Sequence, residues 1–200
     1  MITRAFERKP ARRIRRCPSP ALALTIILAI CGCATGFSNG DRAEARFQIE
    51  KQIYAYTYAL DGGDLDALGE LFEHATMRVE GTDAAYEGAE AVRQTNIDFN
   101  LFYDNEGNAG LYRPDTTPRT RHVTTNVIID VAEDGSSATA RSSVVVFQFA
   151  PSAPLRPILA AGYRDRFEPI EGRWRFVERI HLLTHIEDVR LHLRQPPPGQ

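Results

Sequence analysis

The chain has 200 residues and a mass of 22.4 kDa, a length that favours one domain with one core over a multidomain assembly. Its composition, 43% hydrophobic and 25% charged, matches average globular usage and excludes a collagen-like, coiled-coil or wholly disordered protein. Residues 1–32 hold seven basic side chains and one acidic side chain, so the rest carries a net charge of −8, which repels a phosphate backbone and predicts no nucleic acid partner.

The first segment is a leader. Basic residues between positions 4 and 16 precede an apolar run at 20–30, and small residues follow it. This order is typical of a bacterial export signal, and the run is shorter than the ~20 residues of a stable membrane span. Ile30-Cys31-Gly32-Cys33 resembles a lipobox, which implies cleavage before Cys33 and its lipidation. We predict a leader at 1–33 and a linker at 34–40.

The leader predicts a location in the bacterial cell envelope, either lipid-anchored or periplasmic or secreted. A lipid anchor would be the only contact of the protein with a membrane. A non-cleaved anchor and a misassigned start codon remain the alternatives. All three cysteines, Cys17, Cys31 and Cys33, lie in this leader, so the residues that follow offer no disulfide, zinc-thiolate site or cysteine nucleophile.

Helices are expected in the first half of the domain, which we place at 41–193. From Asp41 onward, apolar residues at 49, 53, 56 and 60 recur at the spacing of one helix face, and Gly62-Gly63 ends that helix. Asp64 is a good N-cap for a second helix at 65–72. A short strand at 77–80 and a third helix at 89–102 follow.

Strands are expected in the second half. Period-two alternation predicts strands at 121–131 and 138–149, joined by a turn at Asp134-Gly135, and at 159–167 and 173–183, joined at Glu171-Gly172. Prolines at 151, 154 and 157 predict a loop between the two hairpins. Residues 103–118 read as a long loop and 194–200 as a disordered tail. Helices followed by long strands predict an α+β fold in which a strongly curved, mainly antiparallel sheet encloses three helices and a pocket.

The order of these residues resembles the SnoaL-like branch of the nuclear transport factor 2-like superfamily, the cone-shaped α+β fold, from about 45 to 191. The resemblance rests on the following residues: Tyr58-Ala-Leu-Asp61 with Asp64, Leu71-Phe72, Tyr86-Glu-Gly88, Arg121-His122 with Asn126, Gly162-Tyr163-x-Asp165-x-Phe167, and Gly172-Arg-Trp174-Arg-Phe176. Members include dehydratases, a dehydrochlorinase, isomerases, cyclases and proteins without known activity, so the resemblance specifies the fold more closely than the reaction.

The resemblance implies a catalytic dyad of Asp61 and His122, as in scytalone dehydratase-like and dehydrochlorinase-like members. A carboxylate bonded to one imidazole nitrogen fixes the tautomer and leaves the other nitrogen to take a proton from carbon. The alternative is a structural pair at the end of a helix. The chain has Leu60 where the dehydratase pattern has tyrosine and no matching second histidine or arginine, so neither of those two particular activities is implied.

Tyr56, Tyr58 and Asn126 are the expected pocket donors. Asn126 lies four residues from His122, on the same strand face and roughly 13 Å away at ~3.3 Å per residue. His181 and His185 share that spacing, which is too wide for one metal, so we predict no metal site and no cofactor. The following arginines are expected to form a solvated face paired with Glu168, Glu171 and Glu178: Arg164, Arg166, Arg173, Arg175 and Arg179.

Two functions remain open. The domain could be a cofactor-free lyase or isomerase that acts on a small apolar molecule, or a non-catalytic ligand-binding or assembly domain. A homodimer is expected through the convex sheet face, because Val123, Thr125, Val127 and Ile129 would share the strand face opposite His122.

Overall fold

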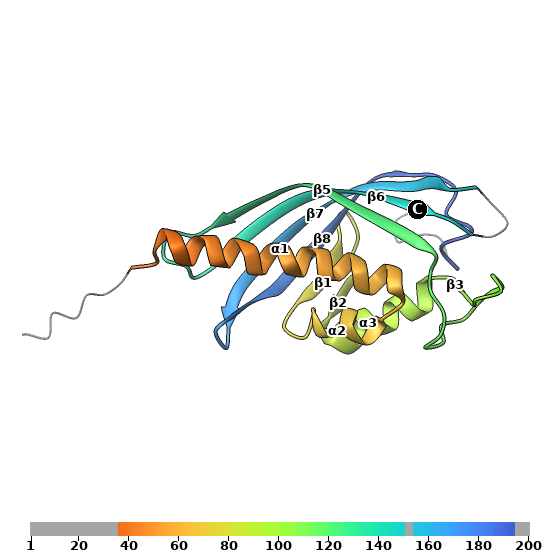
Figure 1. Cartoon of the computed structure of the whole chain (residues 1–200), viewed down its shortest axis with the longest axis horizontal. Coiled ribbons are helices and arrows are strands. Elements are labelled where there is room, and N and C mark those ends of the chain that lie inside the picture. The colour runs from red at the N-terminus through yellow and green to blue at the C-terminus, as the bar shows by residue number, and fades with distance from the viewer. Residues whose placement is uncertain (1–35, 151–153, 195–200) are drawn as a thin grey trace, which may run out of the picture. The chain divides into compact units, whose positions relative to one another are not determined.

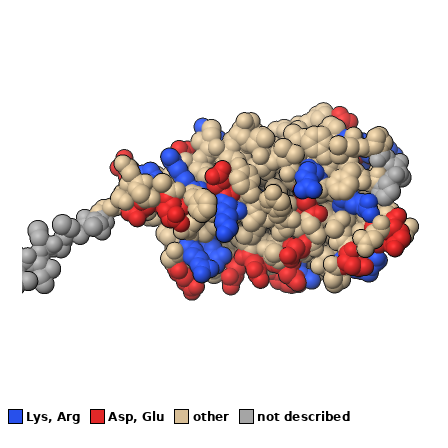
Figure 2. Space-filling model, in the orientation of Figure 1, with Lys and Arg blue, Asp and Glu red and all other residues tan. Residues whose placement is uncertain are grey.

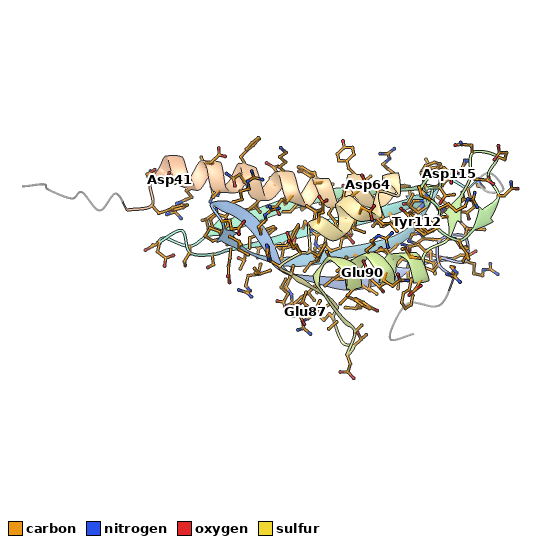
Figure 3. The ribbon with its side chains drawn as sticks, turned by 90° about the horizontal axis from the view of Figure 1, so that it is seen from below. Asp41, Asp64, Glu87, Glu90, Tyr112 and Asp115 are labelled. Carbon is orange, nitrogen blue, oxygen red and sulfur yellow. The ribbon has the colours of Figure 1, made fainter. Side chains whose placement is uncertain are left out.

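Helix α1 (Asn39–Gly62) is fixed at both ends by its sequence. In the computed structural model, which describes residues 36–150 and 154–194, the Ser38 hydroxyl accepts a hydrogen bond from the Asp41 backbone N–H at 3.1 Å. The Asp41 carboxylate, labelled in Figure 3, accepts one from the Ser38 backbone N–H at 2.9 Å, which completes a capping box. The helix therefore begins two residues before Asp41, the predicted start.

Gly63 ends α1 in the left-handed region, with φ of 71°. A Cβ at this position would lie 2.4 Å from the carbonyl oxygen of Thr116, so the close approach requires glycine for a second reason. The predicted apolar face is confirmed, because Ile49, Ile53, Tyr56 and Leu60 are all buried in the core. Packing on this face orients the last turn of α1, which carries Asp61.

The remaining elements confirm the predicted α+β class. In chain order they are α2 (Leu65–Glu70), β1 (Thr76–Val79), β2 (Ala85–Glu87), α3 (Gly88–Phe99), β3 (Phe102–Tyr103), β4 (Ala109–Gly110), β5 (Thr120–Val131), β6 (Ala138–Gln148), β7 (Arg156–Ile170) and β8 (Arg173–Ile186). Six strands form one sheet in the order β2-β1-β8-β7-β6-β5, antiparallel except for the β1–β8 pair. Figure 1 shows the long strands bending over α1, with α2 and α3 on the same side of the sheet.

Both predicted hairpins, β5–β6 and β7–β8, are present, and several boundaries differ. Helix α3 ends at Phe99 rather than 102, and the predicted loop at 103–118 contains β4 and the end of β3. Strand β7 begins at Arg156 and runs through Pro157, which pairs with Phe147 at a register shift. A proline can occupy this position because the shift already interrupts the ladder.

Strand β5 carries a β-bulge at Asn126 that reverses its alternation. The register shifts between Thr125 and Ile128, and Asn126 has φ of 53°. After the bulge, Val127 and Ile129 pack against the core, whereas Ile128 is exposed. The prediction that Val127 and Ile129 lie on the outer face is therefore wrong, because the inserted residue flips the side chains that follow it.

Strand β8 contains a second irregularity, at Val177. Phe176 pairs with Phe167 and Glu178 pairs with Arg166, so Val177 has no partner in the register. The shift turns Arg179 toward the inside of the sheet, where its side chain is fully buried. The prediction of a solvated arginine face is wrong for Arg179.

Arg179 forms a buried ion pair with Asp165. Its Nε and Nη2 atoms donate to the two carboxylate oxygens, each at 2.8 Å, and neither side chain is exposed. The guanidinium carbon lies 4.2 Å from the ring centre of Tyr56, 4.3 Å from that of Tyr163 and 4.8 Å from that of Phe176. Three aromatic rings and a bidentate carboxylate thus replace water around this charge.

Residues 188–194, which we call the C-terminal strap, return across the end of α3. The backbone N–H of Leu101 donates to the carbonyl of His192, and that of Arg194 donates to the carbonyl of Phe99, both at 2.7 Å. The strap brings His192 and Leu193 against the helical layer. Residues 195–200, predicted as a tail, lie outside the described residues.

The surface of the domain mixes both charges. Figure 2 shows Asp and Glu side chains along the lower edge of the face in view, with Lys and Arg between them. Among the helices of the described ranges, none combines the length and the apolar character of a membrane span.

Candidate functional site

A cavity of about 170 Å³ lies between the helices and the inner face of the sheet. Among the described residues, its wall contains no Asp, Glu, Lys or Arg, so it provides an environment for a neutral molecule. The polar groups on the wall come from three tyrosines, three histidines, two asparagines and one threonine. They are Tyr56, Tyr86, Tyr163, His122, His181, His192, Asn96, Asn100 and Thr95.

The predicted Asp61–His122 contact is present, and His122 lines this cavity. Asp61 Oδ1 lies 2.6 Å from His122 Nδ1, and its Oδ2 accepts the backbone N–H of His122 at 2.8 Å. The Thr120 hydroxyl donates to Oδ1 at 2.8 Å. The two side chains are only 6% (His122) and 8% (Asp61) exposed. Each carboxylate oxygen is thus held by β5, so the orientation of the carboxylate toward the imidazole is fixed.

The environment keeps Asp61 ionised. Burial on its own would raise the pKa of this carboxyl, but hydrogen bonds from His122 and Thr120, together with the attraction of the imidazole, hold the pKa below its ordinary value. An ionised Asp61 accepts the Nδ1 proton of His122. In a neutral imidazole with this tautomer, the other nitrogen, Nε2, carries the lone pair, and His122 is part of the cavity wall.

The predicted donors divide into one that reaches the cavity and two that do not. Tyr56 lines the cavity and is 2% exposed. The predictions for Tyr58 and Asn126 are wrong. Tyr58 is 73% exposed, because its position two residues after Tyr56 turns it to the opposite side of α1. Asn126 is exposed at the β5 bulge, where its amide faces the Ser143 hydroxyl at 3.5 Å.

Two histidines of the cavity wall were not predicted as site residues. His181 comes from β8 and His192 from the C-terminal strap. Burial is the main cause that lowers the pKa of each to about 3, so both imidazoles are neutral near pH 7. The sequence would have placed His181 on the inner face only if the irregularity at Val177 had been known. His192 lies after the last predicted strand, so no periodic pattern assigns it to a face.

Other candidate positions are less informative. Within residues 36–150 and 154–194, no group of three or more His, Cys, Asp or Glu side chains is placed to hold a metal ion. His185, which was considered with His181, is exposed and pairs with Glu187 at 2.9 Å. Cys33, the predicted lipidation site, lies outside the described residues.

A curved, mainly antiparallel sheet that encloses helices and a cavity defines a cone-shaped α+β domain, a fold shared with an NTF2-like protein described below. The family model for the SnoaL-like domain matches residues 41–180, and the chain belongs to this family. No curated protein matches the sequence.

Solved structures of the same fold agree with this assignment. An NTF2-like protein from Novosphingobium aromaticivorans has 23% identity and a TM-score of 0.54, with 74% of this chain and 90% of that one covered. A putative scytalone dehydratase from the same organism has 21% identity and a TM-score of 0.56, with 80% and 96% covered. A hexachlorocyclohexane dehydrochlorinase, LinA type 2, has 19% identity and a TM-score of 0.58, with 82% and 100% covered. At these identities the similarity shows the fold alone.

Proposed function

We propose that this domain is a cofactor-free lyase or isomerase in which Asp61 and His122 abstract a proton from carbon in a small, neutral, largely apolar molecule. The observation that carries the proposal is the 2.6 Å contact between Asp61 Oδ1 and Nδ1 of His122, a residue that lines a cavity whose described wall holds no Asp, Glu, Lys or Arg. Similarity to a putative scytalone dehydratase and to a dehydrochlorinase agrees with such chemistry.

In this proposal, His122 Nε2 takes the proton and Asp61 stabilises the imidazolium that forms. The electron pair of the broken C–H bond forms a new double bond to the neighbouring carbon. At the same time, either a leaving group departs with its bonding electrons or a neighbouring carbonyl oxygen takes up the negative charge. Return of the proton to a different carbon completes an isomerisation, and its release to the leaving group completes an elimination. Tyr56, on the same wall, can donate a hydrogen bond to the developing charge.

The proton transfer can be measured without knowing the natural substrate. Cyclohexanone in D₂O exchanges its α-protons when a base removes a proton from carbon and returns a deuteron, and NMR follows the loss of signal. We expect exchange above the buffer rate for the wild type, none above it for His122→Ala, and a rate lower by about 10² to 10⁴ for Asp61→Asn. His185→Ala is the matched control, because His185 is exposed and outside the cavity wall.

Catalysis by this dyad is ruled out if His122→Ala exchanges as fast as the wild type. The second candidate function is ligand binding without turnover, which is favoured by the neutral wall, since it provides no cation to stabilise a transition state. Under that alternative, cyclohexanone binds to the wild type without exchange above the buffer rate, and Asp61→Asn and His122→Ala lower the melting temperature instead.

We further propose that the domain reaches the bacterial cell envelope through its leader and is lipidated at Cys33. The support is the basic, apolar and small-residue order that ends at Cys33. Intact-mass analysis of membrane fractions should give an acylated chain that begins at Cys33, and Cys33→Ser should release the protein from the membrane. A full-length protein in the cytoplasm would contradict this proposal.

A homodimer through the convex sheet face is also proposed. Val123 and Ile128 are 41% and 44% exposed on the outer face of β5, which forms one edge of the sheet. Light scattering at micromolar concentration should give twice the monomer mass, and Val123→Glu with Ile128→Glu should halve it. A monomeric wild type would refute the dimer.

A further inference from the structure

His181 holds a fixed position on the cavity wall. Its strand, β8, lies between β1 and β7 in the sheet, so its backbone is paired on both sides. Its imidazole packs edge-on against two aromatic rings, with centroids 5.0 Å from that of Tyr163 and 6.3 Å from that of Tyr56. A side chain held by two strands and two rings has little freedom to turn away from the cavity.

The Nε2 atom of His181 is buried and has no hydrogen-bond partner among the described residues. A buried polar atom without a partner is destabilising, so folded proteins usually provide one. Because His181 is part of the cavity wall, a molecule in the cavity is the available source of that partner.

The charge of the site indicates which partner fits. His181 is a neutral imidazole, because burial and the nearby Arg179 both lower its pKa, to about 3. Arg179 itself is engaged by both carboxylate oxygens of Asp165 and is not part of the cavity wall. A carboxylate or phosphate ligand would therefore find no cation on the wall, whereas a neutral oxygen needs none.

We propose that His181 Nε2–H donates a hydrogen bond to a carbonyl or hydroxyl oxygen of the ligand, and that the cavity takes neutral, oxygen-bearing molecules of about one six-membered ring. The size follows from the volume of about 170 Å³, since an apolar cavity of about 150 Å³ accommodates benzene. The inference rests on the proposed function, because it specifies the class of molecule on which His122 acts.

The test compares cyclohexanone with methylenecyclohexane, a ring of the same shape in which CH₂ replaces the oxygen. Binding of each is measured by NMR titration with the wild type, His181→Met and His181→Gln. Met and Gln have the same length, but only Gln keeps an N–H donor. We expect His181→Met to bind cyclohexanone about 3- to 10-fold more weakly than His181→Gln, the usual effect of one neutral hydrogen bond. Methylenecyclohexane should bind both variants within about 2-fold of each other, which also shows that both are folded.

The same titrations separate this inference from the proposed function. If His181→Met and His181→Gln bind cyclohexanone equally, the inference is overturned, even if His122→Ala still abolishes proton exchange. If His181→Met weakens only cyclohexanone while His122→Ala leaves the exchange rate unchanged, the oxygen contact stands and the catalytic proposal fails. His185→Met, on the same strand but outside the cavity wall, should bind both probes like the wild type.

Discussion

Asp165→Asn should destabilise the domain severely while changing almost no volume. The substitution keeps the shape of the side chain but removes the negative charge of the carboxylate, which accepts two hydrogen bonds of 2.8 Å from Arg179. The guanidinium, fully buried among three aromatic rings, then has no counter-charge and cannot reach water. Loss of one partner of such a pair costs about 3 to 5 kcal/mol. For a domain of this size, that corresponds to a melting temperature lower by about 6 to 20 °C.

The assay is thermal and urea unfolding at pH 7, followed by the fluorescence of Trp174, which is buried in the core. The informative control is the double variant Asp165→Leu with Arg179→Met, which replaces both charges by apolar side chains and leaves no unpaired ion. We expect it to be more stable than Asp165→Asn alone, since hydrophobic replacement of a buried pair is often neutral or stabilising. An Asp165→Asn protein as stable as the wild type, or a double variant less stable than the single one, would refute this account of the pair.

Three further outcomes are expected. In the folded protein the pKa of His181 and of His192 is about 3, below the unfolded value of ~6.5. The unfolded chain therefore binds more protons, and the stability of the fold should fall as the pH drops below 6.5. His181→Gln should make the decline of the urea midpoint between pH 7 and pH 5 shallower. Gly63→Ala should lower stability by at least about 1 kcal/mol in urea unfolding, because of its positive φ and the Thr116 carbonyl. A chain that starts at Asp41 should be less stable than one that starts at Thr35 by about 0.5 to 2 kcal/mol, because it lacks the Ser38 cap; equal melting curves would contradict this.

Much of the fold could be predicted because local patterns encode it. The apolar spacing of α1, the stop at Gly63 and the turns at Gly135 and Gly172 depend on residues close together in the sequence. The juxtaposition of Asp61 with His122 came from a family resemblance, not from periodicity, since the two residues lie 61 positions apart. The hydrogen bonds that organise the dyad confirm that contact and leave its catalytic role as a prediction.

The errors in assigning side chains to the two faces of the sheet have one physical cause. Alternation in a strand assigns every second residue to the same face only while the ladder is regular. The bulge at Asn126 and the unpaired Val177 each insert one residue, so they exchange the two faces of β5 for the positions after Asn126, and those of β8 from Glu178 to Leu183, where a further register shift follows. As a result, Asn126 lies outside the site, whereas Arg179 and His181 lie on the inner face of the sheet. A bulge is a relation between two strands, so one strand considered alone does not reveal it.

For a ligand that leaves past the C-terminal strap, the lifetime in the cavity depends on the local stability of this end of the domain. Three residues of the strap line the cavity: Val189, His192 and Leu193. Two backbone hydrogen bonds, to Phe99 and Leu101, attach the same segment to the end of α3 and the residues after it. A ligand that leaves past the strap must wait for these bonds to open, so its dissociation rate cannot exceed their opening rate. Hydrogen exchange at the amides of Leu101 and Arg194 measures that rate at high pH, where exchange is faster than reclosing, and a bound ligand that holds the strap closed should slow the exchange of both amides together.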